Sequence, residues 1–197
     1  MANSANPSKR ELTAHAIALC AQRLADEHGL DGFTMDQLAE AAGVSRRTLF
    51  NYYPGKLDAV LGEDKEPDPA LFAAFTAGGP TGELIGDLRL LITGFLEANE
   101  TDAEAVARFR RLLVADPRIF HAAHGRFERA TAHFTELIGT RADAGLGARE
   151  AGILARLILS LFDQALADFV EDPESGLTHH FNQTFETVQR LLGRSDN

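Results

Sequence analysis

The chain has 197 residues, 45% of them hydrophobic, and a formal net charge of −10, so it can bury the core of one large domain or of a small and a larger one. No stretch approaches the roughly 18 consecutive apolar residues of a membrane span, and the polar N-terminus lacks the apolar segment of a signal peptide. The single cysteine, Cys20, cannot form an internal disulfide, which fits a reducing compartment. We therefore expect a cytoplasmic protein that has no membrane partner.

The acidic excess is unevenly distributed along the chain. In residues 1–58 basic and acidic side chains nearly balance, and within 45–58 the cations Arg46, Arg47 and Lys56 outnumber a single acid. Binding of phosphate needs local positive charge and not a basic protein as a whole. An acidic remainder would weaken non-specific adhesion to a polyanion and favour binding through one focused patch.

Apolar residues recur with helical spacing almost throughout, and no window shows the sustained alternation that is typical of a strand. The sequence therefore predicts an all-α fold. In the first third of the chain we expect helices at Lys9–His28, Met35–Ala42, Arg46–Tyr52 and Lys56–Leu61. Ser8 with Glu11, and Thr34 with Gln37, have the spacing of capping boxes at the first two helix starts.

The acidic, proline-containing segment 62–69 is predicted to be a loop, and Gly-Gly-Pro at 78–80 a second break. Further helices are expected at Ala70–Ala77, 81–99, 102–116, 118–142, 148–171 and 178–193. We therefore expect a small domain at 1–61, a linker and connecting helix at 62–80, and a larger helical domain at 81–197.

The stretch 34–56, TMDQLAEAAGVSRRTLFNYYPGK, has the pattern of a helix-turn-helix. Ala39 is small enough to let two helices cross closely, and Gly43 tolerates the left-handed backbone of the turn. Arg46 and Arg47 lie at the start of the second helix, where a recognition helix meets base edges in the major groove. The residues expected in the core are Leu38, Ala39, Val44, Leu49 and Tyr53.

This stretch closely resembles the DNA-binding domain of the TetR family of bacterial regulators. The resemblance covers about residues 8–60, includes Gly-Phe-Thr at 32–34, and is carried by Ser45, Thr48, Leu49, Phe50, Tyr52, Tyr53 and Lys56. It implies an all-α transcriptional regulator with an N-terminal three-helix helix-turn-helix DNA-binding domain. The larger C-terminal helical domain would bind a ligand and form a homodimer.

The resemblance also implies a role for each matching residue. Arg46 and Arg47 match base-reading positions, and an arginine can bond bidentately to guanine O6 and N7. Phe50 is expected to touch a thymine methyl, and Asn51 a base or a phosphate. The implied phosphate contacts are Thr34, Thr48, Tyr52 and Lys56, and the Ser45 hydroxyl is expected to cap the helix or to donate to phosphate. Asp36 departs from the pattern, because some family members place a base-contacting arginine there.

Reading two half-sites of a palindromic operator in the major groove needs a two-fold dimer. The helices expected at 148–171 and 178–193 are candidates for its interface, because in the TetR family the matching helices of two subunits form a four-helix bundle. The first carries an apolar band wider than one stripe, which suggests burial on two sides. The alternative is that both helices belong only to the core of their own chain.

A phenylalanine-rich interior suits the apolar or amphipathic small-molecule effector that the resemblance implies, since ligand pockets are mostly apolar with a few placed polar groups. The candidate effector-binding residues are Phe95, Phe109, Arg110, Phe120, His124, Phe127, Phe162 and Asp163. For each of them the alternative is an ordinary place in the core or on the surface.

We expect no metal, no cofactor and no enzymatic activity. Neither His121 with His124 nor His179 with His180 has the further ligands that a metal needs, and the sequence contains no common catalytic or phosphate-binding motif. The sequence therefore predicts a repressor that a small-molecule effector releases from its operator. The alternatives are a DNA-binding protein without an effector, whose C-terminal part dimerises or binds another protein, and a small helical enzyme.

Overall fold

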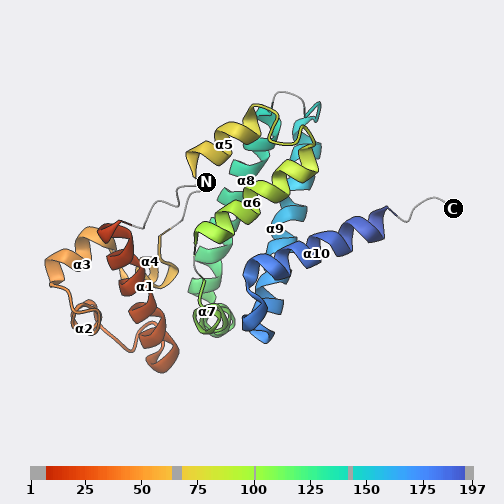
Figure 1. The fold of residues 1–197 in the computed structure, drawn as a ribbon. Coiled ribbons are helices and arrows are strands. Elements are labelled where there is room, and N and C mark those ends of the chain that lie inside the picture. Colours follow the sequence, from red (N-terminus) through yellow and green to blue (C-terminus); the bar gives the residue numbers. More distant parts are fainter. Residues whose placement is uncertain (1–7, 64–67, 100, 142–143, 194–197) are drawn as a thin grey trace. The chain divides into compact units, whose positions relative to one another are not determined.

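The computed structural model describes residues 8–63, 68–99, 101–141 and 144–193, and these ranges contain helices and no strand. The helices are α1 Lys9–His28, α2 Met35–Ala41, α3 Arg46–Tyr52, α4 Lys56–Leu61, α5 Pro69–Thr76, α6 Leu84–Ala98, α7 Ala103–Ala115, α8 Pro117–Thr140, α9 Ala148–Glu171 and α10 Leu177–Leu192 (Figure 1). The predicted all-α fold is confirmed, and the expected helix bounds differ from the observed ones by a few residues. None of the described helices is long and apolar enough to cross a membrane.

The chain divides into two compact units, each made of two stretches. Unit 1 contains Met1–Lys65 and Glu104–Arg126, and unit 2 contains Glu66–Ala103 and Phe127–Asn197. This division differs from the expected one in chain order, because most of α7 and the first part of α8 group with the N-terminal helices. The physical reason is that Leu112 of α7 and Ile119 of α8 are buried in the core that α1–α4 form.

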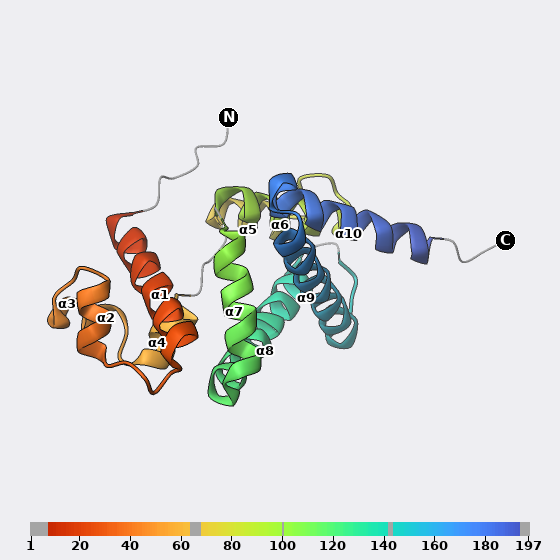
Figure 2. The ribbon, with the colours of Figure 1, turned by 90° about the horizontal axis from the view of Figure 1, so that it is seen from below.

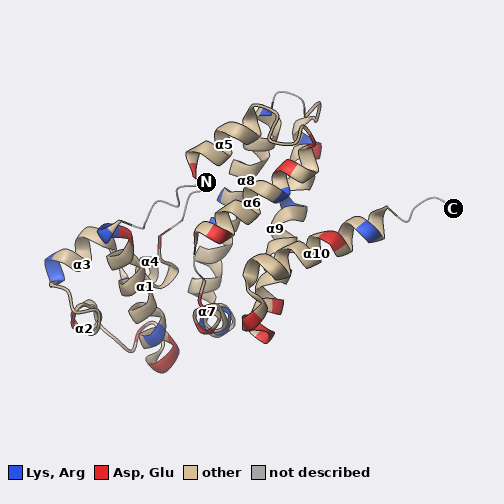
Figure 3. Cartoon of the chain, in the orientation of Figure 1, with Lys and Arg blue, Asp and Glu red and all other residues tan. Residues whose placement is uncertain are grey.

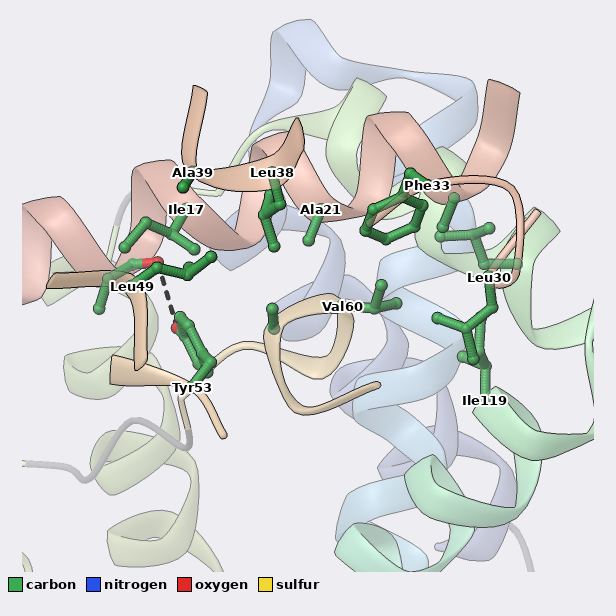
Figure 4. Close-up of a cluster of buried hydrophobic side chains, with 14 residues drawn as sticks. Ile17, Ala21, Leu30, Phe33, Leu38, Ala39, Leu49, Tyr53, Val60 and Ile119 are labelled. Atoms are coloured by element: carbon green, nitrogen blue, oxygen red, sulfur yellow. Dashed lines mark hydrogen bonds between the residues drawn. The ribbon is translucent and has the colours of Figure 1, made fainter. Parts of the chain in front are cut away.

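Unit 1 is organised around α1, whose small and branched residues face the other helices. The Ser8 hydroxyl accepts a hydrogen bond from the Glu11 amide over 3.2 Å, and the Glu11 carboxylate accepts one from the Ser8 amide, as the predicted capping box requires. Ile17 and Ala21, one turn apart, pack in the same core as Leu38 and Leu49 (Figure 4). Burial of these apolar side chains is the main force that holds the short α2 and α3 in place.

Polar side chains of α8 and α1 bind carbonyl groups at the C-terminal end of α4. Arg126 of α8 donates to the carbonyl oxygens of Leu61, over 2.7 Å, and Gly62 at the C-terminal end of α4. Gln22 of α1 donates to the neighbouring carbonyl of Val60 over 3.0 Å. Side chains from two other helices therefore satisfy carbonyl groups that a helix end leaves without partners.

Unit 2 has its main core between α9, α10 and α6. Phe169 of α9 and Phe181 and Phe185 of α10 are buried together there, and α10 packs against α9 and α6 (Figure 2). A 3-10 turn at Pro173–Ser175 joins α9 to α10. A second cluster in the same unit joins α5, α6, α8 and α9 around the fully buried Leu88 and Ile138.

Candidate nucleic-acid interface

The segment from the start of α2 to the start of α3 has the geometry of a helix-turn-helix. The Thr34 hydroxyl accepts a hydrogen bond from the Gln37 amide over 3.2 Å, and the Gln37 side chain accepts one from the Thr34 amide over 2.8 Å. Gly43 has φ +65°, the left-handed conformation that a glycine adopts without strain. The Val44 amide then donates to the Ala39 carbonyl over 3.0 Å, which closes the turn.

The predicted core of the motif is largely confirmed. Leu38, Ala39, Leu49 and Tyr53 are buried, whereas Val44 is only half-buried against the same cluster. The Tyr53 hydroxyl donates to the Ala14 carbonyl over 3.1 Å (Figure 4). This bond ties the residue that follows α3 to α1. The orientation of α3 is therefore set by its packing in the core shared with α1 and α2 and not by its own few residues.

The N-terminal end of α3 carries a cap and two cations. The Ser45 hydroxyl accepts from the Thr48 amide over 3.0 Å and lies 2.7 Å from the Thr48 hydroxyl, so both side chains serve the helix start. Arg46 and Arg47 follow directly and are exposed, and they form the basic segment at the α2–α3 turn in Figure 3. Asn51, about one turn beyond them, is also exposed.

Arg46 makes two contacts that its neighbours in the sequence do not indicate. Its Nη1 atom donates to Oδ2 of Asp36 on α2 over 3.3 Å. Its guanidinium carbon lies 5.6 Å from the centre of the Phe50 ring. Asp36 stands ten positions earlier, and only the reversal of the chain between α2 and α3 brings it to Arg46. The change from the family pattern at Asp36 was the signal that could have suggested this pair.

The residues expected to contact phosphate differ in their surroundings. Lys56 donates a hydrogen bond to the Phe33 carbonyl over 2.9 Å. Its ammonium also lies 5.2 Å from the centre of the Phe33 ring. Tyr52 is half-buried, with the Arg10 guanidinium 5.4 Å from its ring centre. An ammonium group has three donors, so this hydrogen bond leaves Lys56 able to bind a further acceptor.

The eight predicted effector residues fall into both units. Phe109, Arg110, Phe120 and His124 belong to unit 1, and Phe95, Phe127, Phe162 and Asp163 belong to unit 2. Phe95 and Phe162 pack, partly buried, against the core of unit 2. The exposed Phe120 ring stacks on His124 at 6.3 Å.

Unit 1 also has an open depression of about 460 Å³ on its surface. Leu57 of α4 lines it together with Pro117, Arg118, His121 and Ala122 of α8. None of the eight predicted effector residues is among them. Within the described part of the chain, no group of three His, Cys, Asp or Glu side chains is placed to hold a metal ion.

These features define a helix-turn-helix protein, and comparison with known proteins specifies the family of its N-terminal domain. Residues 20–60 match the family model "Bacterial regulatory proteins, tetR family". The "Putative mycofactocin biosynthesis transcriptional regulator MftR" of Mycobacterium tuberculosis is 44% identical over 48 residues, which are 24% of each chain. Residues 20–60 thus carry the N-terminal domain of the TetR family, which confirms the predicted resemblance. The match to the curated relative spans about a quarter of that protein's length.

The fold of the chain is similar beyond that domain to a solved structure. A "putative TetR-family transcriptional regulator" from Mesorhizobium loti MAFF303099 matches with a TM-score of 0.52 and 17% identity. The match covers 94% of this chain and 98% of that chain. At this identity the likeness establishes the shared fold alone.

Proposed function

We propose that the protein is a sequence-specific DNA-binding transcriptional regulator. The observation that carries the proposal is the start of α3, where the capped helix exposes Arg46 and Arg47 next to the turn of a TetR-family motif. In a helix-turn-helix this end of the second helix reaches base edges in the major groove. Arg46, Arg47, Phe50 and Asn51 are the proposed base-reading residues, and Thr34, Ser45, Thr48, Tyr52 and Lys56 the proposed phosphate contacts.

The proposed DNA-binding form is a homodimer on a palindromic operator. Support comes from α9, which buries one face in unit 2 and yet exposes Ile153 (57%) and Leu157 (37%) one turn apart on another. Exposed branched residues at this spacing suit a self-complementary two-fold contact. The substitution Leu157→Lys is therefore expected to shift sedimentation from dimer toward monomer. Val114→Lys, which replaces a branched residue of α7 that is 89% exposed, is the matched control because it lies outside α9.

The proposed regulation is release of a repressor by a small apolar or amphipathic effector in the cytoplasm. The regions proposed for these roles are 1–61 for DNA binding, 62–80 as the connection and 81–197 for effector binding and dimerisation, although residues 104–126 of the last region pack in unit 1. The effector would shift the population toward a state that does not fit the operator, and it must bind that state better to do so. The leading candidates for contact with the effector are Phe95 and Phe162, which pack, partly buried, against the core of unit 2.

A selection from random double-stranded DNA tests the DNA-binding function. The wild-type protein is expected to enrich one palindromic sequence, and Arg47→Ala to lose about 1–3 kcal/mol of specific affinity while it relaxes base preference. Arg23→Ala, which removes an exposed arginine of α1 outside the motif, should leave the selected sequence unchanged. No enrichment by the wild-type protein would overturn the proposal.

A thermal-shift screen against small molecules tests the regulation separately. A true effector raises the unfolding temperature by mass action and lowers the affinity for the enriched DNA. A ligand that stabilises the protein and leaves DNA affinity unchanged would refute release. A protein that binds DNA and responds to no small molecule would favour the alternative in which the C-terminal part only dimerises or binds another protein.

A further inference from the structure

The ion pair between Asp36 and Arg46 lies where α2 and α3 both begin. The two side chains are 63% and 68% exposed, and the Phe50 ring, 43% exposed, lies beside the guanidinium. Exposed ion pairs of this kind contribute little to folding stability and are weakened by salt. A carboxylate at this place would also repel the phosphates of DNA. Neither a contribution to folding stability nor one to general DNA affinity therefore explains why the ion pair is present.

The geometry constrains the guanidinium of Arg46 on two sides. Nη1 bonds to Asp36 over 3.3 Å, and the Phe50 ring lies 5.6 Å from the guanidinium carbon. A guanidinium has five donors in a planar fork, so donors remain for the two acceptors O6 and N7 of a guanine. The long, flexible side chain is thereby held in few of its rotamers, which lowers the entropy lost when it binds a base.

The carboxylate has a further chemical property that matters in the major groove. Only Oδ2 of Asp36 accepts from Arg46 in the structure, and a carboxylate has two acceptor oxygens. In the major groove the amino groups N4 of cytosine and N6 of adenine donate to such an acceptor, whereas thymine O4 and guanine O6 would repel it. Only in a G·C pair does such a donor stand beside the two guanine acceptors O6 and N7 that suit an arginine. The pair thus presents donors for guanine beside an acceptor for cytosine.

We infer that Asp36 is a positioning and specificity-determining residue, which holds Arg46 for guanine and makes the pair select G·C in the major groove. This inference rests on the proposed DNA-binding function and adds to it the base class that is read. It also assigns a purpose to the departure from the family pattern. The carboxylate of Asp36 repels base acceptors such as thymine O4 and also repels phosphates. It therefore lowers the general affinity for DNA and raises the selectivity for G·C.

The test compares the sequences that wild type, Asp36→Asn, Arg46→Ala and the double variant select from random double-stranded DNA. Asp36→Asn keeps the shape of the side chain and removes its charge. Glu40→Gln is the matched control, because Glu40 is an exposed acid on the same helix with no described contact to α3. Both neutral variants should bind random DNA more tightly, since each removes one negative charge.

Asp36→Asn alone should reduce the preference for G·C at one position of each half-site, by about tenfold. In the Arg46→Ala background the same change should alter that preference by less than about twofold, because coupled residues are not additive. A preference unchanged by Asp36→Asn, or equal effects in both backgrounds, would overturn the inference. If Asp36 acted only by stabilising the start of α2, Asp36→Asn would change the unfolding curve and leave the selected sequence the same. Absence of any enrichment by the wild-type protein would refute the proposed DNA-binding function itself.

Discussion

Arg141 donates from Nη2 to Oδ2 of Asp87 over 2.8 Å, and neither side chain is exposed to solvent. The other carboxylate oxygen accepts from both the amide and the hydroxyl of Thr81, each over 2.7 Å. Arg141 also donates to the carbonyl oxygens of Phe75 and Gly78, over 3.2 Å and 3.0 Å. This buried network fastens the segment between α5 and α6 to the residue that follows α8. Buried charges persist only when they are paired and hydrogen-bonded in this way.

Replacing one partner of this ion pair should destabilise the protein severely. Asp87→Ala or Arg141→Ala leaves an uncompensated buried charge, which costs about 3–5 kcal/mol of the free energy of unfolding. Urea denaturation of the full chain measures this loss of unfolding free energy. As a control, Glu186→Ala removes an acid that pairs with Arg89 in a largely exposed position, and it should cost less than about 1 kcal/mol. Similar losses from the buried and the exposed pair would argue against the network.

The same network predicts a pH dependence of stability in acid. Burial alone would raise the pKa of Asp87, but the hydrogen bonds from Thr81 and Arg141 outweigh it and hold the pKa below the ordinary value of 3.8. The stabilisation is therefore complete above that value and is lost as the pH falls through the lower pKa of the folded state. The slope of unfolding free energy against pH below about 4 should be smaller in Asp87→Asn than in wild type; identical slopes would contradict the ion pair.

A second titration is expected at alkaline pH. Burial raises the pKa of Tyr53 to about 12, so the folded state holds its phenolic proton at a pH where the unfolded chain has released it. Stability should therefore be complete below the ordinary pKa of 10.0 and fall as the pH rises toward 12. Tyr53→Phe loses the hydrogen bond to Ala14 and about 1 kcal/mol at neutral pH, and chemical denaturation between pH 9 and about 12 should show a shallower decline than in wild type.

Lys56→Ala tests the assignment of a phosphate contact. The ammonium lies at the start of α4 and keeps donors beyond its hydrogen bond to Phe33. Affinity for all sequences should fall together, and the slope of log K against log salt concentration should become shallower by about 1, because one fewer counterion is released. Titrations at several salt concentrations measure this slope. A changed base preference with an unchanged slope would mean that Lys56 reads bases.

The helix-turn-helix could be predicted because its determinants are local in sequence. Thr34 and Gln37 cap a helix three residues apart, and Gly43 supplies the left-handed turn by itself. The long helices could be predicted for the same reason, since apolar spacing and breaks such as Gly-Gly-Pro at 78–80 mark their ends. Short-range rules therefore recovered the elements and the position of Arg46 and Arg47 at the start of α3.

Contacts between distant residues could not be predicted in this way. Leu112 and Ile119 look like core residues of a C-terminal domain, and only the structure places them in the core of α1–α4. Asp87 and Arg141 lie 54 residues apart, and neither has a sequence signal that names the other. The ion pair of Asp36 with Arg46 likewise depends on the angle between two helices, which tertiary packing sets.

The most direct measurement for the central claim is the stoichiometry and selectivity of binding to the duplex that the wild-type protein enriches. Sedimentation should show two protomers on one two-fold symmetric duplex, with half-site centres roughly 34–36 Å apart or a multiple of that. Arg47→Ala should prefer this duplex over a scrambled one by about 1–3 kcal/mol less than the wild-type protein does. One protomer on an asymmetric site, or a wild-type protein that does not distinguish the enriched duplex from the scrambled one, would contradict the account.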